Sequence, residues 1–126
     1  MKRYAIIGSR GFTDYELLKS TIQTRGINDI GEIVSGGARG ADSLAEQYAI
    51  DNNIKLTVFY ADWETYGRKA GHMRNQYIID NCDVVLAFWD GISRGTADSI
   101  KKAQKQNKSV ILINYKAINP ISLGSY

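Results

Sequence analysis

The chain alternates between short apolar runs and longer segments with helical periodicity. Five runs rich in β-branched and aromatic residues predict strands over 4–8, 32–35, 55–61, 83–88 and 109–114. Between these runs, apolar residues recur every three to four positions, which predicts helices over 15–25, 41–52, 71–81 and 96–106. This alternation is typical of βαβ units, whose strands form a parallel sheet.

The predicted strands carry apolar residues on both faces, as central strands covered by helices on each side require. Because crossover connections are right-handed, we expect an α/β fold: a Rossmann-like three-layer sandwich whose five-stranded parallel sheet has the order 3-2-1-4-5. With 44% hydrophobic residues, the 126-residue chain can form one domain over 1–126, of which 115–126 is a C-terminal tail. Ligands of such sheets bind at the carboxyl ends of the strands, at the switch point between the first and fourth strands.

Composition argues against several other classes of protein. The single cysteine, Cys82, excludes an internal disulfide framework, and the single histidine, His72, argues against a transition-metal site. We therefore expect no metal and no cofactor. The apolar stretch near the N-terminus is too short for a signal peptide or a membrane span, which predicts a cytoplasmic protein without a membrane partner.

Three glycine-rich loops, each with an arginine, follow the first, second and fourth predicted strands; they cover residues 8–12, 35–42 and 89–96. In a parallel sheet these loops meet at one edge. Glycine allows the backbone to approach a ligand closely, and the N-terminus of the following helix offers unpaired N–H groups with a partial positive charge. The loops therefore predict a phosphate-binding pocket, although their spacing matches neither the Walker motif nor G-x-G-x-x-G.

Arginines in these loops are expected to make bidentate contacts to phosphate, and the serine and threonine hydroxyls to donate hydrogen bonds. Segment 60–75 gathers aromatic and cationic side chains near the pocket mouth, where Trp63 or Tyr66 can stack on a base and Asn75 can bind its edge. The predicted ligand-binding residues are Gly8, Ser9, Arg10, Ser35, Gly36, Gly37, Arg39, Gly40, Asp42, Trp63, Arg74, Asn75, Asp90, Gly95 and Thr96.

Each of these assignments has a structural alternative. The glycines can simply make tight turns, and Asp42 in the first turn of its helix suits the helix dipole without contacting a ligand. Tyr66 can pack on the domain or on a partner subunit, and Trp89 either floors the pocket or fills the core. Cys82 is expected to be a small buried residue.

Five motifs together resemble one known family. They are G-S-R-x-F (8–12), V-S-G-G-A-R-G-A-D (34–42), A-D-W (61–63), A-G-x-x-R-N (70–75) and A-F-W-D-G-x-S-x-G-T (87–96). The set resembles the YspA-type proteins of the SLOG superfamily, which are related to the LOG phosphoribohydrolases and to the DNA-processing protein DprA. The resemblance implies a Rossmann-like fold with a pocket for a nucleotide or a nucleotide-derived ligand.

The LOG enzymes carry an arginine on the helix before the fourth strand and a glutamate just inside the next helix, and both are linked to cleavage of the N-glycosidic bond of a nucleoside 5'-monophosphate. Arg74 matches that arginine, whereas Ser99 stands in the place of the glutamate and Asp98 precedes it. A serine does not stabilise an oxocarbenium-like centre as a carboxylate does. Arg74 and Asp98 are therefore the candidate catalytic residues, with Asp42 and Asp90 as other possible substitutes.

Three functions stay open. Binding of a phosphorylated, nucleotide-derived small molecule without turnover is favoured, because the LOG glutamate is absent. The alternatives are nucleotide hydrolysis of the LOG type and single-stranded DNA binding as in DprA. The formal net charge of +3 and the absence of a polybasic run argue against nucleic acid. The LOG relatives also imply a homodimer.

Overall fold

The sheet consists of five parallel strands in the order β3-β2-β1-β4-β5, which confirms the predicted topology. The computed structural model describes residues 1–117, so the predicted tail lies, from residue 118 onward, outside the described residues. The strands are β1 (Lys2–Gly8), β2 (Ile30–Ser35), β3 (Lys55–Val58), β4 (Val84–Trp89) and β5 (Ser109–Asn114). Because β1 pairs with both β2 and β4, the order reverses beside it, as it does at a ligand-binding switch point.

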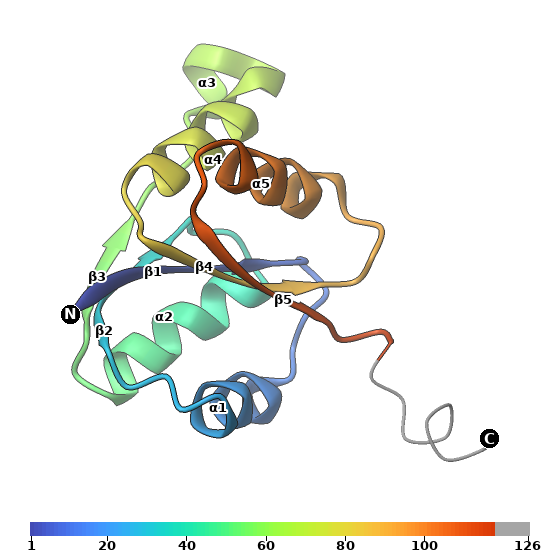
Figure 1. Ribbon diagram of the computed structural model, residues 1–126. Coiled ribbons are helices and arrows are strands. Elements are labelled where there is room, and N and C mark those ends of the chain that lie inside the picture. Colours follow the sequence, from blue (N-terminus) through green and yellow to red (C-terminus); the bar gives the residue numbers. More distant parts are fainter. Residues whose placement is uncertain (118–126) are drawn as a thin grey trace.

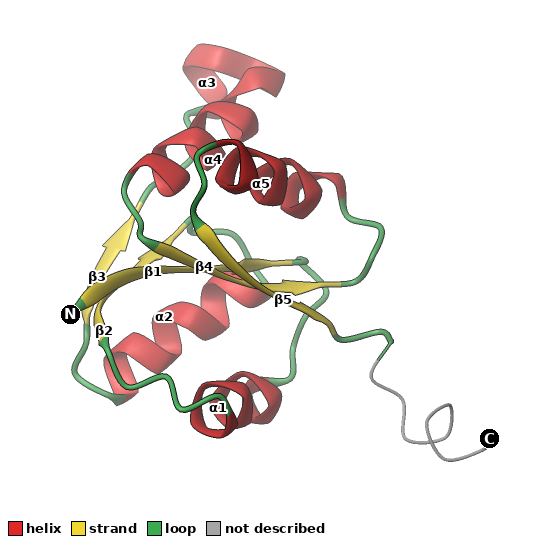
Figure 2. Ribbon diagram, viewed as in Figure 1, coloured by secondary structure: helices red, strands yellow, loops and turns green. Residues whose placement is uncertain are grey.

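Helices cover both faces of this sheet (Figure 1). They are α1 (Tyr15–Thr24), α2 (Ala41–Asp51), α3 (Trp63–Tyr66), α4 (Ala70–Asp80) and α5 (Arg94–Lys105), with a short 3-10 helix over Gly67–Lys69. Figure 2 shows α1 and α2 on one side and α4 and α5 on the other. The described residues therefore form the predicted three-layer sandwich.

Successive side chains of a strand point to opposite faces of the sheet, and so apolar residues form a core on each face. On β1, Tyr4 and Ile6 face the α1–α2 side and pack with Leu18 and Phe88, all of them 5% exposed or less. Ala5 and Ile7 face the other side, in a cluster that contains Ile79. The buried Cys82 belongs to this second cluster, as predicted.

Helix starts follow local capping chemistry. Asp14 caps α1, because its carboxylate accepts a hydrogen bond from the backbone N–H of Leu17 at 3.0 Å. Asp62 caps α3 in the same way by accepting from Thr65 N–H at 3.2 Å. No helix in the described part of the chain is long and apolar enough to cross a membrane.

The structure differs from the prediction mainly after β3. This strand was expected to continue to residue 61, but it ends at Val58 because its partner β2 ends at Ser35, directly opposite. Phe59 N–H still donates to the carbonyl of Ser35 at 2.9 Å, but beyond this bond the edge strand has no neighbour to accept its hydrogen bonds. The chain instead leads into α3 and the 3-10 helix, neither of which the sequence analysis predicted.

The close pairing of β1 and β4 yields a first prediction. A Cβ atom on Gly8 would collide with the carbonyl oxygen of Phe88 and lie 2.8 Å from the Cβ of Ala41. Replacement Gly8→Ala is therefore expected to lower the free energy of unfolding by about 1–3 kcal/mol, measured by urea denaturation. Gly95→Ala is the matched control, because a Cβ there meets nothing within 4 Å inside α5. That control should be neutral or slightly stabilising; equal losses in the two variants would contradict the steric explanation.

Candidate functional site

A pocket of about 410 Å³ lies at the carboxyl edge of the sheet, where the loops after β1 and β4 meet α4. We call it the first chamber. A second chamber, of about 490 Å³, lies toward the loop after β2 and the residues that follow β3. The two chambers share Arg10, Ala38, Trp63 and Arg74 as lining residues, and so they lie side by side; together we call them the site. Its position is the edge that the strand order predicts.

Most of the predicted ligand-binding residues line this site. The first chamber is lined by Gly8, Ser9, Arg10, Asp42, Trp63, Arg74, Asn75, Gly95 and Thr96, and the second by Gly36, Gly37 and Arg39 as well as the shared residues. Ser35, Gly40, Asp90 and the candidate catalytic Asp98 line neither chamber.

Ser9 holds the loop after β1 in place. Its backbone N–H donates to the carbonyl of Phe88 at 3.0 Å, and its own carbonyl accepts from Ala41 N–H at 3.2 Å. Its hydroxyl oxygen accepts from Asp90 N–H at 3.1 Å. These bonds tie the loops after β1, β2 and β4 together, which explains why a serine of the glycine-rich loop is only 2% exposed.

The loop after β2 is held between Asp42 and Arg74. The Asp42 carboxylate accepts from Ala38 N–H at 3.1 Å, and the Arg74 guanidinium donates to the carbonyl of Gly36. Ser35, which is fully buried, donates to the Glu46 carboxylate at 3.2 Å. Ser35 therefore supports the loop from beneath.

Burial sets the electrostatics of the Asp42–Arg74 pair. Desolvation raises the pKa of Asp42 to about 6, although the hydrogen bond from Ala38 and the charge of Arg74 act in the opposite direction. Desolvation also lowers the pKa of Arg74, against the effect of Asp42. Burial therefore makes the charged form of Asp42 less favourable than it is in water.

Asp98 belongs to a network between α4 and α5. One of its oxygens pairs with Lys102 Nζ at 2.6 Å, and the other accepts from Asn75 Nδ2 at 3.2 Å and lies 3.2 Å from His72 Nδ1. Burial opposes ionisation, but the hydrogen bonds from Lys102 and Asn75 prevail and lower the pKa of Asp98. Asn75 also accepts from Arg74 Nε at 3.0 Å, so its amide is engaged within the protein.

The Asp90 carboxylate is used within its own loop. It accepts from the backbone N–H groups of Ile92 and Ser93 at 2.8 and 2.7 Å and from the Ser93 hydroxyl at 2.7 Å. The bonds to Ser93 and Ile92 lower the pKa of Asp90 to about 2. Asp90 thus shapes the turn that leads into α5.

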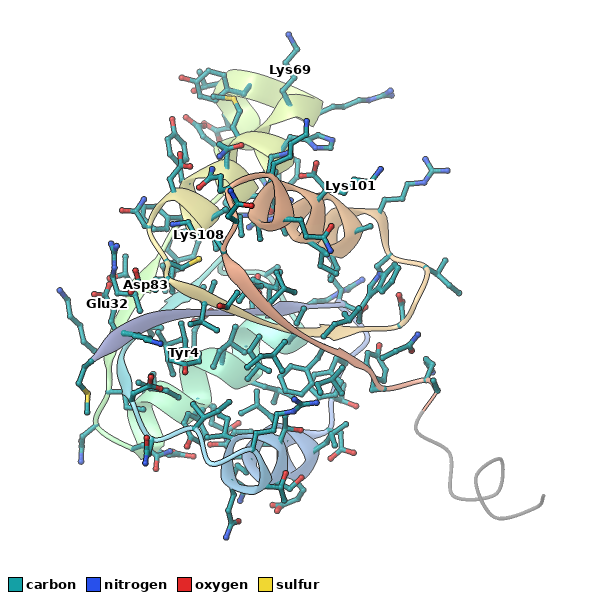
Figure 3. The ribbon with its side chains drawn as sticks, in the orientation of Figure 1. Tyr4, Glu32, Lys69, Asp83, Lys101 and Lys108 are labelled. Carbon is teal, nitrogen blue, oxygen red and sulfur yellow. The ribbon has the colours of Figure 1, made fainter. Side chains whose placement is uncertain are left out.

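Guanidinium groups dominate the site. Of the chain's seven arginines, five line the chambers: Arg10, Arg39, Arg68, Arg74 and Arg94. Among residues 1–117, none of these five has a carboxylate at ion-pair distance. Glu32 pairs with Lys55, and Asp83 pairs with Arg3. Figure 3 shows both acidic residues near the start of the strands. Within residues 1–117, Asp42 is the one acidic residue that lines the chambers.

Aromatic residues divide between the site and the core. Trp63 is 51% exposed and lines both chambers, whereas Tyr66 is 48% exposed and lines neither. Trp89 packs against the core on the α4–α5 side and donates to the carbonyl of Ser93 at 3.0 Å, so it fills the core instead of flooring the pocket. Tyr60 lines the second chamber, a role that the sequence analysis missed because it placed this residue inside a strand.

The buried carboxylate of Asp42 predicts a pH dependence of stability. Its pKa in the folded chain, about 6, exceeds the ordinary 3.8, so the folded state retains a proton that the unfolded chain loses between these values. The associated stabilisation is complete below the lower pKa and is lost as the pH rises through the higher one. The variant Asp42→Asn retains an oxygen that accepts from Ala38 N–H but has no titratable group. Relative to this variant, the free energy of unfolding of the wild type should fall by on the order of 2 kcal/mol between about pH 4 and pH 7. Urea denaturation across this range is the measurement, and parallel pH profiles would contradict the raised pKa.

Comparison with known proteins confirms the resemblance seen in the motifs. Residues 3–66 match the profile of the family described as YspA, cpYpsA-related SLOG. The Gene 61 protein of Mycobacterium phage D29 is 36% identical over 121 residues, which cover 88% of this chain and 95% of the phage protein.

The fold is similar to that of DNA processing protein A (DprA) from Streptococcus pneumoniae, with a TM-score of 0.72 and 19% sequence identity. The similarity covers 95% of this chain and 53% of DprA, so the chain spans about half the length of that protein. On the family match and the phage relative together, the chain belongs to the YspA, cpYpsA-related SLOG family.

Proposed function

We propose that the protein binds a phosphorylated, nucleotide-derived small molecule in the two chambers. The observation that carries this proposal is the set of five arginines around one site, none of which lies at ion-pair distance from a carboxylate of residues 1–117, although the charge of Asp42 acts on Arg74. Unpaired guanidinium groups repel one another, and a multivalent anion relieves that repulsion. Phosphate fits the planar fork of arginine and accepts two parallel hydrogen bonds from it.

The backbone around the first chamber supports the same ligand chemistry. Ser93, Arg94, Gly95 and Thr96 line this chamber at the N-terminus of α5, where N–H groups lack helical partners. The chamber volume of about 410 Å³ falls within the range of small-molecule sites. Membership of the SLOG family is compatible with a nucleotide or a nucleic acid as the ligand. The compact chamber favours the nucleotide.

The carboxylates near the site support binding without turnover. Asp98 is held by Lys102 and Asn75, and Asp90 is held by its own turn. Asp42 supports the loop after β2. Ser99, which stands where the LOG enzymes have a glutamate, lines the first chamber but has no group that activates water as a carboxylate does.

The proposal predicts that arginine removal weakens nucleotide binding. Thermal-shift screening against nucleoside mono-, di- and triphosphates identifies a binder, since a ligand that prefers the folded state raises the unfolding temperature. Arg10→Ala and Arg94→Ala should then each weaken its affinity by about tenfold or more, because each removes charge-assisted hydrogen bonds. Arg25→Ala is the matched control, because this arginine ends α1 and lines neither chamber.

Two results would contradict this function. If both arginine variants bind the nucleotide as tightly as the control, the chambers are not the site. If chromatography after incubation recovers a base and ribose phosphate, the protein is a hydrolase. Selective binding of a single-stranded oligonucleotide, with an affinity that falls steeply with salt, would favour the nucleic-acid alternative.

A further inference from the structure

Two aromatic rings line the second chamber while remaining largely exposed to solvent. Tyr60 is 73% exposed and Trp63 is 51% exposed. Other large apolar residues, such as Ile50 and Ile92, are also exposed, and single exposed residues are ordinary. Tyr60 and Trp63 differ from them because both rings line one cavity. Exposed aromatic faces beside cationic groups are the surfaces on which bases stack.

Tyr60 rests on the backbone of the loop after β2. A Cβ atom on Gly37 would lie 2.5 Å from Cδ1 and Cε1 of the Tyr60 ring, and the φ angle of Gly37 is +70°. Glycine is therefore required at this position both for the backbone conformation and for the approach of the ring. The loop holds one side of Tyr60, and the rest of the ring is open to solvent.

Trp63 is supported by a second glycine. A Cβ on Gly71, in the first turn of α4, would lie 3.3 Å from Cη2 of the indole. The carboxylate of Asp62 caps the turn that carries Trp63, which fixes the backbone at this point. Figure 1 shows α3 beyond the start of α4. Trp63 of this helix lines both chambers.

The second chamber combines these rings with positive charge. Arg39 lines this chamber, and Arg10 and Arg74 lie in the part that it shares with the first chamber. A ligand that spans the site therefore meets arginines in the shared part and aromatic surface beyond it. This order matches a nucleotide, in which a phosphate group is joined through ribose to a planar base.

We propose that the second chamber is the nucleobase subsite, in which the base stacks on Tyr60 or Trp63 while the phosphate lies toward Arg10 and Arg74. This inference rests on the proposed function and assigns the orientation of the ligand. Tyr66 provides the internal comparison, because it is exposed to a similar degree as Trp63 and belongs to the same helix but lines neither chamber.

The experiment compares ligands with and without a base. Isothermal titration with the four nucleoside 5'-monophosphates and with ribose 5-phosphate is carried out on Tyr60→Ala, Trp63→Ala and the control Tyr66→Ala. Loss of a stacking ring weakens binding of a base about fivefold or more. Tyr60→Ala or Trp63→Ala should therefore weaken the best-bound monophosphate by at least that factor, while binding of ribose 5-phosphate and the Tyr66→Ala control stay unchanged.

Tryptophan fluorescence provides a second measurement of whether the base binds near Trp63. The chain has two tryptophans, and Trp89→Phe leaves Trp63 as the single reporter. A monophosphate that stacks nearby should change the Trp63 emission, and ribose 5-phosphate should not.

The outcomes separate the two proposals. If the monophosphates bind but neither aromatic variant differs from Tyr66→Ala, the base lies elsewhere and the subsite is wrong, although the phosphate function stands. If Tyr60→Ala and Trp63→Ala weaken ribose 5-phosphate as much as the monophosphates, the rings support the phosphate site and do not bind a base. If neither the monophosphates nor ribose 5-phosphate binds the wild type, the proposed orientation is overturned; the phosphate function is overturned only if the di- and triphosphates of the thermal-shift screen also fail to bind.

Discussion

The parallel pairing of β1 with β4 is the contact on which the site depends. It aligns Gly8 with Phe88 at the ends of two neighbouring strands, so the loops that follow must leave the sheet side by side. Ser9 then joins these loops to the start of α2 through its backbone and its hydroxyl. Stacking of Phe12 on Phe88, with ring centroids 4.7 Å apart, anchors the first loop to the core. Core packing and loop geometry therefore share these residues at the base of the site.

The positive charge of the arginines at the site is only partly neutralised, by Asp42. Asp42 is buried and Arg74 is partly buried, and the two lie close enough for each to perturb the pKa of the other. Both groups are nevertheless held against loop backbone, by bonds to Ala38 and Gly36. Polar groups oriented in advance in this way reduce the cost of ordering a site when its ligand binds.

Much of this architecture follows from local sequence pattern. Strand order and the three converging loops were predictable because apolar periodicity, glycine positions and right-handed crossovers are local or general rules. The end of β3 was not, since it is set by where β2 ends. The position of Tyr60 in the site depends on that same boundary. Pairing of Asp98 with His72 and Asn75 joins two helices, and helical spacing within either one does not reveal it.

The residues shared by the two chambers also bear on stoichiometry. Because Arg10 and Arg74 line both chambers, two separate anions placed in them would compete for the same guanidinium groups and repel each other. The chambers are therefore not independent sites. Occupancy of one by a small anion penalises the other, whereas a single molecule that extends through both avoids this penalty. The shared arginines therefore favour one extended ligand per chain over two small ones.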